Sequence, residues 1–464
     1  MYDLEREQLL GRIAELEKAL AEAQGLIQVL KEEIETLKRA GKRQAVPFER
    51  RKKVAKPQKR GRRKGKGEFK HREKPKEEEV NETKQAEICG CPDCGGELTD
   101  LKEHEQYEID IPAVQPIITR YVMVSGRCPC CAERHWLYHP DQISKATGAA
   151  GVVIGPRAKA LAADLKHRFG ASYGKVCEVI NDAFGLRVSR SAWYQADQRL
   201  GKQAEGVYQE LIAAMRACRV VHSDETGWRI GALSAWLWVF TSQTITVYAI
   251  EKSRSHQVVV NILGQEFAGV LVSDCFLAYD HHALEAWLKQ KCLSHLLKDL
   301  KNLNETKTRG AVRFARNLTA LLKDALQLKA QKSQLPEAQF DQQAAALETR
   351  LDQLIDAKRQ LTDPDNARFA KRLRKHRLHI LRFLYVDELD ATNNQAERML
   401  RPAVITRKTN GCNRSETGAQ THAILSSLLA TCRQQAIPIL DYLIQLQRFG
   451  QSPPSLTKGL SLPT

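Results

Sequence analysis

Apolar residues near the start of the chain recur at alternating spacings of three and four residues. The series is Ile13, Leu16, Leu20, Ala23, Ile27, Leu30, Ile34 and Leu37. A helix packed on the protein's own body would also be apolar along one side. However, a strict 3.5-residue period that continues for four heptads is typical of a coiled coil. We therefore predict a coiled coil over residues 1–40 that joins copies of this chain into a homo-oligomer.

The apolar period is also helical over residues 150–215, where two helical stretches are separated by a short break. Gly185 lies at this break, and Ser189 has the position of an N-cap for the second helix. A helix, a tight turn and a second helix are typical of a helix-turn-helix, which would offer Arg190, Trp193, Tyr194 and Gln195 to the major groove of DNA. Two helices that merely pack together give the same pattern, so both interpretations remain open.

β-rich runs dominate the next part of the chain, which reads RVVHSD, SAWLWVF, TITVYAI and AGVLVSD, with a short helix before the last run. Three strands, a helix and a fourth strand are the order of an RNase H-like core. We assign the first part of this core to residues 216–300, of which 283–300 have a helical pattern. Residues 230–250 carry no formal charge, but the polar TSQT at their centre favours a β-hairpin over a membrane span.

A long helical stretch separates this part from the end of the core. Residues 301–385 are rich in Leu, Ala, Gln, Lys and Arg, with breaks at Pro336 and at TDPDN, and we predict an α-helical insertion there. The core would then resume over residues 386–445. The Pro- and Ser-rich residues 446–464 are expected to form a disordered tail.

The net charge of +17 is concentrated in one part of the chain. Residues 42–76 contain 17 Lys or Arg residues and three Glu residues, a net charge of +14. We predict that residues 41–80 form a disordered basic linker that binds DNA through its phosphates. Its most basic part contains Arg60, Arg62, Arg63 and Lys64. A solvated linker without a DNA-binding role is the alternative.

Two CxxC pairs follow the basic linker, Cys91 with Cys94 and Cys128 with Cys131. Their spacing predicts a zinc ribbon over residues 81–140, with four thiolates around a structural Zn²⁺ and strands between the two pairs. Cys89 and Cys130 are close enough to replace one of these ligands. The sequence begins without the apolar region of a secretory signal, and its cysteine spacing is that of a metal site rather than of a disulfide scaffold. We therefore expect a cytoplasmic protein without a membrane anchor.

Three acidic residues have positions suited to metal-dependent chemistry. Asp224 and Asp274 follow β-rich runs, and Glu397 lies on a helix predicted to open near Asn393. Taken singly, each acid fits a solvated surface role. Together, they are the ligands that two Mg²⁺ or Mn²⁺ ions need for phosphoryl transfer. Asp224 is expected just past a four-residue strand, where its carboxylate can leave the sheet edge.

Several residues near these acids are candidates for supporting roles. Asn393, Glu397 and Arg401 share one face of the predicted helix, and Arg398 and Arg401 suit phosphate groups. Cys292 and His295 form a CxxH pair, which cannot close a zinc site alone. Other acids were ranked below the three candidates, namely Glu225, Asp280, Asp387, Glu388 and Asp390.

These features together resemble the transposases of the insertion-sequence-66 family, which have an Asp-Asp-Glu catalytic core. The similar passages are the leading heptads, GRRKGKG, CPDCGGEL, CPCC, HSDETGW, SDCFLAYD, CLSH and NNQAERMLRP. The resemblance implies a multidomain α/β fold whose RNase H-like core contains an α-helical insertion. It also implies two divalent metal ions in each active site and transposon-end DNA as substrate.

The resemblance implies a role for each matched residue. Asp224 would bind both metals, Asp274 one of them and Glu397 the other, with Cys292 and His295 in support. Members of the family often have Asp before the paired asparagines, whereas this chain has Thr392. The segment after Asp274 is also less typical, but neither departure removes a metal ligand.

The sequence therefore predicts a DNA transposase that cuts transposon ends and joins the freed 3′-OH to target DNA. Accessory proteins of the same element are possible further partners. A DNA-binding regulator descended from a transposase is one alternative, which the intact acidic triad speaks against. An RNase H-like nuclease without strand transfer is another, but it leaves the coiled coil and the zinc ribbon without a use.

Overall fold

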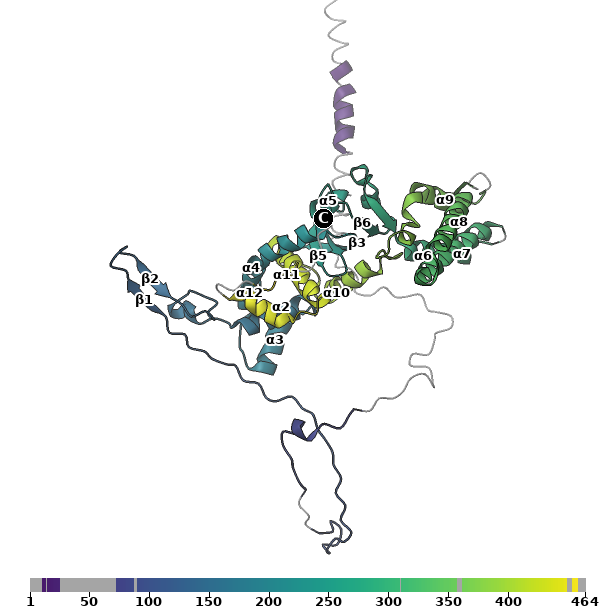
Figure 1. The fold of residues 1–464 in the computed structure, drawn as a ribbon. Coiled ribbons are helices and arrows are strands. Elements are labelled where there is room, and N and C mark those ends of the chain that lie inside the picture. The colour runs from purple at the N-terminus through teal and green to yellow at the C-terminus, as the bar shows by residue number, and fades with distance from the viewer. Residues whose placement is uncertain are drawn as a thin grey trace, which may run out of the picture.

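A computed structural model describes residues 11–13, 15–25, 72–86, 90–308, 310–356, 361–448 and 453–457. The described part is a mixed α/β protein, which confirms the predicted class. Figure 1 shows a central sheet with helices α4 (Arg190–Arg216) and α11 (Glu416–Gln434) on one side and the green helices α7 (Ala311–Ala330) and α8 (Glu337–Asp356) on the other. The described helices lack the length and apolar composition needed to cross a membrane.

The described N-terminal residues, 11–13 and 15–25, are helical and exposed. Ile13, Leu16 and Leu20 of the heptad seam are 50%, 64% and 58% exposed. Apolar side chains in these positions are available to a partner helix, although oligomerisation stays a prediction. The rest of the seam and the basic residues Arg60, Arg62, Arg63 and Lys64 lie outside the described residues.

The cysteine-rich region contains one hairpin, in which β1 (Val124–Arg127) pairs antiparallel with β2 (Arg134–Leu137). The strands predicted between the two CxxC pairs are otherwise wrong, because residues 101–123 form no strand. Their apolar side chains are instead exposed, as Ile117 and Ile118 at 94% illustrate. Without a second layer to cover them, these residues do not form a stable sheet.

Three helices follow, α2 (Pro156–His167), α3 (Tyr173–Phe184) and α4 (Arg190–Arg216). Helix α3 ends at Gly185, whose φ of +64° is the left-handed conformation that glycine adopts easily. The Ser189 hydroxyl accepts a hydrogen bond from the Ala192 N–H and caps α4. Both signals act where the sequence placed them, because each depends only on the local backbone.

The central sheet has five strands in the order β5-β4-β3-β6-β7. Strand β3 (Val220–Ile230) pairs antiparallel with β4 (Leu233–Thr241), which pairs antiparallel with β5 (Thr246–Glu251). On its other edge β3 runs parallel to β6 (Val270–Ser273), and β6 runs parallel to β7 (Leu288–Lys291). The β4–β5 pair confirms the hairpin predicted for the uncharged stretch.

The helical pattern assigned to residues 283–300 is wrong in its first half, which contains β7. The strand reads LKQK, and its last three residues are polar but buried. An edge strand of this composition lacks the apolar alternation by which strands are recognised. The helix α6 (Leu293–Thr306) begins only after Cys292.

Alternate residues of β4 face different parts of the core, as the two-residue period of a strand requires. Trp238 and Phe240 pack with residues of α4, α5 (His256–Leu263), α11 (Glu416–Gln434) and α12 (Ile439–Gln447). Leu237 and Val239 pack under α10 (Asn394–Asn410). Leu456, in the segment expected to be a disordered tail, is 1% exposed and belongs to the first of these clusters.

The insertion consists of α6, α7 (Ala311–Ala330), α8 (Glu337–Asp356) and α9 (Pro364–Lys375). Helix α8 begins directly after Pro336 and α9 begins at Pro364, so both predicted breaks are confirmed. Its apolar core includes Val270 and Val272 of β6. The inserted helices therefore share an apolar core with the sheet and do not form a separate domain.

Candidate active site

Asp224 lies inside β3, opposite Val239 of β4, rather than just past a four-residue strand as expected. Strand β3 continues to Ile230 because β4 pairs with it over its whole second half. On the other edge, the parallel pairing with β6 ends at His222 and Val272. Asp224 therefore lies just beyond the end of β6, where its carboxylate is partly buried.

Asp274 directly follows β6, as predicted, and its Oδ1 accepts a hydrogen bond of 2.9 Å from the Phe276 N–H. Because β3 and β6 are parallel neighbours, Asp224 and Asp274 lie at the same edge of the sheet. Glu397 is in the first turn of α10, which packs against β3. Segments far apart in the sequence thus direct three carboxylates to one region.

Burial and neighbouring carboxylates shift the pKa of Asp224 upward. Burial, then the neighbouring Glu225 carboxylate, and then Asp274 and Glu397 together raise it to about 7. In the described part of the chain, Asp224 forms no ion pair that would offset this charge. Carboxylate oxygens are the ligands that Mg²⁺ and Mn²⁺ take. However, the oxygens of Asp224, Asp274 and Glu397 do not all lie within 4.8 Å of one another.

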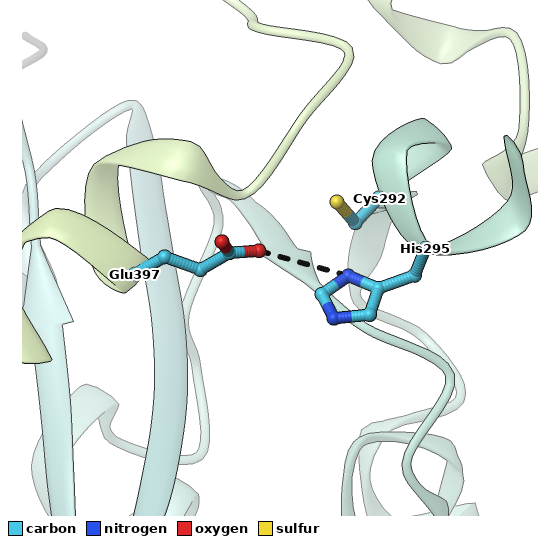
Figure 2. Close-up of side chains that lie close together, drawn as sticks. All are labelled: Cys292, His295 and Glu397. Carbon is cyan, nitrogen blue, oxygen red and sulfur yellow. Dashed lines mark ion pairs between the residues drawn. The ribbon is translucent and has the colours of Figure 1, made fainter. Parts of the chain in front are cut away.

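Cys292 and His295 lie beside Glu397 (Figure 2). Their ligand atoms and the Glu397 carboxylate lie within 4.8 Å of one another, the only such group found among the described residues. His295 Nδ1 lies 3.8 Å from Glu397 Oε1. The Cys292 side chain, followed by the Glu397 and Asp274 carboxylates, raises the pKa of His295 to about 9, against the effect of burial. A cationic ring in this place attracts the Glu397 carboxylate, although the 3.8 Å between Nδ1 and Oε1 is too long for a hydrogen bond.

Helix α10 begins at Asn394, as predicted, directly after Asn393. Asn393 is the N-cap residue of α10 and is fully buried. Its Nδ2 donates to the Ser223 carbonyl at 2.8 Å, and its backbone N–H donates to Cys292 Sγ at 3.1 Å. Asn393 thus connects the start of α10 both to the residue before Asp224 and to the CxxH pair, while Arg398 and Arg401 are exposed.

The cysteines of the predicted zinc ribbon form two separate knuckles. The Gly95 N–H donates to the Cys91 carbonyl at 2.8 Å, and the pKa of the Cys91 thiol is lowered by backbone groups of Asp93 and Cys94. Backbone groups of Cys131 and Cys130 lower the pKa of Cys128 in the same way. Among the described residues, no three of these thiols lie in one cluster. The donor set nevertheless suits Zn²⁺, since lowered pKa values favour the thiolate.

The helix-turn-helix candidate exposes Arg190 at the first position of α4. Trp193, one turn further, is 1% exposed and packs with Val176 and Ile180 of α3. Of the residues expected to face DNA, Arg190, Tyr194 and Gln195 therefore remain on the surface.

Two cations near the carboxylates were missed by sequence reasoning. Arg254 pairs with Glu225 at 2.8 Å, and Lys291 at the end of β7 donates to the Asp274 carbonyl at 3.0 Å. A lysine in a run of polar residues gives no signal that it is buried. Arg254 comes close to Glu225 only because the antiparallel strands β3, β4 and β5 fold back on one another.

Known protein families match both the cysteine-rich region and the part of the chain that contains the sheet. Residues 89–132 match the zinc-finger binding domain of transposase IS66, and residues 151–421 match the transposase IS66 family. A relative from Sinorhizobium fredii (strain NBRC 101917 / NGR234), described as uncharacterized protein y4qI, is 26% identical over 58% of this chain. The match covers 55% of the relative's length. Because the larger match spans more than half of the sequence, the chain belongs to the transposase IS66 family.

Proposed function

We propose that this protein is a metal-dependent DNA transposase that cuts transposon ends and joins the freed 3′-OH to target DNA. Family membership supports a transposase function. The observation that supports the finer proposal is that Asp224 and Asp274 lie at the same end of the parallel neighbours β3 and β6, while Glu397 lies in the first turn of α10, which packs on β3. The family resemblance gives these acids the catalytic roles.

The sheet supports an RNase H-like core. Three antiparallel strands in the order β5-β4-β3 continue into two parallel ones, β6 and β7, and α5 connects β5 to β6. The first acid lies on the central strand and the second at the end of its parallel neighbour. The third comes from a helix packed on β3, after the inserted helices.

The carboxylates of Asp224, Asp274 and Glu397 would hold divalent metal ions, which activate the attacking oxygen and stabilise the leaving oxygen in phosphoryl transfer. His295 and Cys292 would keep Glu397 in position, and Asn393 would hold the strand that carries Asp224. The exposed guanidinium groups of Arg398 and Arg401 suit the phosphates of a bound DNA strand.

DNA recognition would be shared among the N-terminal parts of the chain. The basic linker supplies phosphate contacts, and the zinc finger and Arg190 supply further ones. The predicted coiled coil would bring two copies, and thereby two transposon ends, together. Accessory proteins of the same element remain possible partners in this scheme.

The proposal is tested by cleavage and joining of the element's own terminal repeats in Mg²⁺. We compare the wild type with Asp224→Ala, Asp274→Ala and Glu397→Ala, and use Asp387→Ala as the control. The Asp387 side chain is 77% exposed and pairs with Lys332. The expected result is loss of cleavage and joining in the three variants, with DNA-end binding kept, and wild-type activity in the control.

Two other results would contradict the proposal. Cleavage without joining, even with target DNA and Mn²⁺ supplied, would indicate a nuclease. Binding of the ends without any cleavage, with the element's other proteins added, would indicate a regulatory protein.

A further inference from the structure

Lys291 is the last residue of β7, and its side chain is 0% exposed. Its Nζ lies 2.8 Å from Asp280 Oδ1 and donates to the Asp274 carbonyl at 3.0 Å and to Ser273 Oγ at 3.4 Å. An ammonium group has three N–H donors, so each can have a partner here. All three donors of the ammonium group are thus hydrogen-bonded or ion-paired, although the group is removed from water.

A buried ammonium group is costly unless it is paired and hydrogen-bonded. An apolar side chain of similar length would fill the same space without that cost. The presence of a lysine at this buried position is therefore best explained by the groups that its three N–H donors bind. All three lead to one segment, which runs from Ser273 through the proposed metal ligand Asp274 to Asp280.

The segment between Asp274 and Asp280 turns sharply after β6, through a 3₁₀ helix at Leu277–Asp280. Lys291 binds the main chain at its first residue and the carboxylate at its last. It therefore closes this turn and restricts the backbone from which the Asp274 carboxylate projects. The next residue, Cys292, adds a hydrogen bond of 2.8 Å from its N–H to the Ser273 carbonyl.

Asp280 also receives contacts from the end of the insertion. Lys375 Nζ lies 3.1 Å and His376 Nε2 lies 3.4 Å from Asp280 Oδ2. The Asp280 side chain is 5% exposed, so these are contacts within the protein rather than on its surface. The end of the insertion thus contacts Asp280, the same residue that pairs with Lys291.

We propose that Lys291 is a positioning residue that sets the Asp274 carboxylate for divalent-metal binding, with Asp280 as its anchor. The inference rests on the proposed function, since it takes Asp274 as a metal ligand. Lys291 itself touches neither metal nor DNA. Its loss weakens metal binding without changing the affinity for transposon ends.

The test measures Mn²⁺ affinity of the full chain by calorimetric titration, with Asp224→Ala as the baseline for binding elsewhere. Lys291→Met removes the three bonds but keeps an unbranched side chain. Lys289→Met is the matched control, because Lys289 is 4% exposed on the same strand and has no ion pair or side-chain hydrogen bond within the described residues. Transposon-end binding and thermal unfolding are measured on every variant.

Lys291→Met is expected to weaken Mn²⁺ binding about 10- to 100-fold, the range for residues that orient metal ligands. Lys289→Met is expected to keep wild-type Mn²⁺ affinity. Lys291→Arg keeps the charge opposite Asp280, but its rigid, planar group cannot direct donors to Asp280, the Asp274 carbonyl and Ser273 in the way that the compact ammonium group does. It is therefore expected to fold normally and still bind Mn²⁺ more weakly, which a purely structural role does not predict.

The outcomes separate this inference from the proposed function. If Asp274→Ala loses Mn²⁺ binding while Lys291→Met and Lys291→Arg keep it, the positioning role is wrong and the metal site stands. If Asp274→Ala binds Mn²⁺ as tightly as the wild type, the proposed site itself is wrong. If Lys291→Met does not fold, Lys291→Arg alone decides, since wild-type affinity in that variant overturns the role.

Discussion

Arg254 donates two hydrogen bonds to Oε1 of Glu225, from Nε at 3.1 Å and from Nη2 at 2.8 Å. Its guanidinium lies between the rings of Trp236 and Phe276, 4.2 and 3.9 Å from their centres. The Tyr279 hydroxyl donates to the other carboxylate oxygen, Oε2, at 2.8 Å. Both oxygens of Glu225 are therefore engaged, which supports ranking this acid below its neighbour Asp224 as a candidate metal ligand.

Arg254→Ala is expected to destabilise the protein. It leaves Glu225, whose side chain is 2% exposed, with a single partner. Removing one member of a buried ion pair costs about 3–5 kcal/mol, and the 40% exposure of Arg254 reduces this to about 1–3 kcal/mol. The stability of Arg254→Lys should lie between those of the wild type and Arg254→Ala, since lysine keeps the charge but not the paired N–H donors of the guanidinium group. Unchanged urea unfolding of Arg254→Ala would show that the pair contributes nothing.

Gly201 and Gly206 form a matched pair in α4. A Cβ on Gly201 would lie 2.9 Å from Cγ2 of Thr421 on α11, whereas one on Gly206 would have nothing within 4 Å. Gly201→Ala is expected to cost about 1–3 kcal/mol by overpacking. Gly206→Ala is expected to be neutral or to add up to about 1 kcal/mol of helix stability. Thermal unfolding of both variants measures the difference, and equal effects would show that α4 and α11 can move apart freely.

The purified chain is expected to contain about one structural zinc ion per molecule. Cys91→Ser and Cys128→Ser should lose it, because each removes one of four thiolate ligands. Cys130→Ser should keep it and serves as the control. Metal content is measured by mass spectrometry after gel filtration. Loss of zinc in Cys130→Ser together with its retention in Cys131→Ser would shift the ligand set by one residue.

The basic linker is expected to dominate the salt dependence of DNA binding. Replacing Arg60, Arg62, Arg63 and Lys64 by alanine should reduce the slope of log affinity against log salt by about 3 to 4, at about 0.9 per lost phosphate contact. Arg190→Ala should reduce it by about 1 at most, while changing sequence preference if Arg190 reads bases. Binding titrations at several salt concentrations measure both slopes. An unchanged slope in the fourfold variant would remove the linker from the DNA interface.

Acid is expected to destabilise the insertion through His379. Burial, followed by the charges of Lys289, Lys291 and Arg382, lowers its pKa from 6.5 to about 4. Between these values the unfolded chain binds more protons than the folded one, so the free energy of unfolding falls as the pH falls from about 6.5 toward 4.

The variant His379→Gln should reduce this pH dependence by up to about one proton, and the same change at exposed His104 should leave it unaltered. Urea unfolding at pH 7.5, 6.0 and 5.0 gives the slopes. Identical slopes in the wild type and in His379→Gln would mean that His379 titrates normally in the folded protein.

Local patterns predicted the local elements well. Gly185 and Ser189 mark the turn between α3 and α4, and Pro336 and Pro364 mark helix starts in the insertion. Each of these signals acts through its own backbone or its nearest neighbours. Strand β7 was missed because its buried residues, Lys289, Gln290 and Lys291, are polar, and Gln290 and Lys291 are stabilised by partners from other segments.

By itself, the sequence determined the class of fold, the positions of most helices and strands, and the acids and cysteines that carry the family resemblance. These depend on apolar periodicity, turn chemistry and residue spacing, which are properties of short stretches. Only the tertiary structure decided that Asp224 lies within a strand and that Asn393 is buried. It also decided that Arg254 engages Glu225 and that Lys291 binds the Asp274 main chain. Such contacts join segments far apart in the chain, and their energies depend on burial, which no short stretch of sequence specifies.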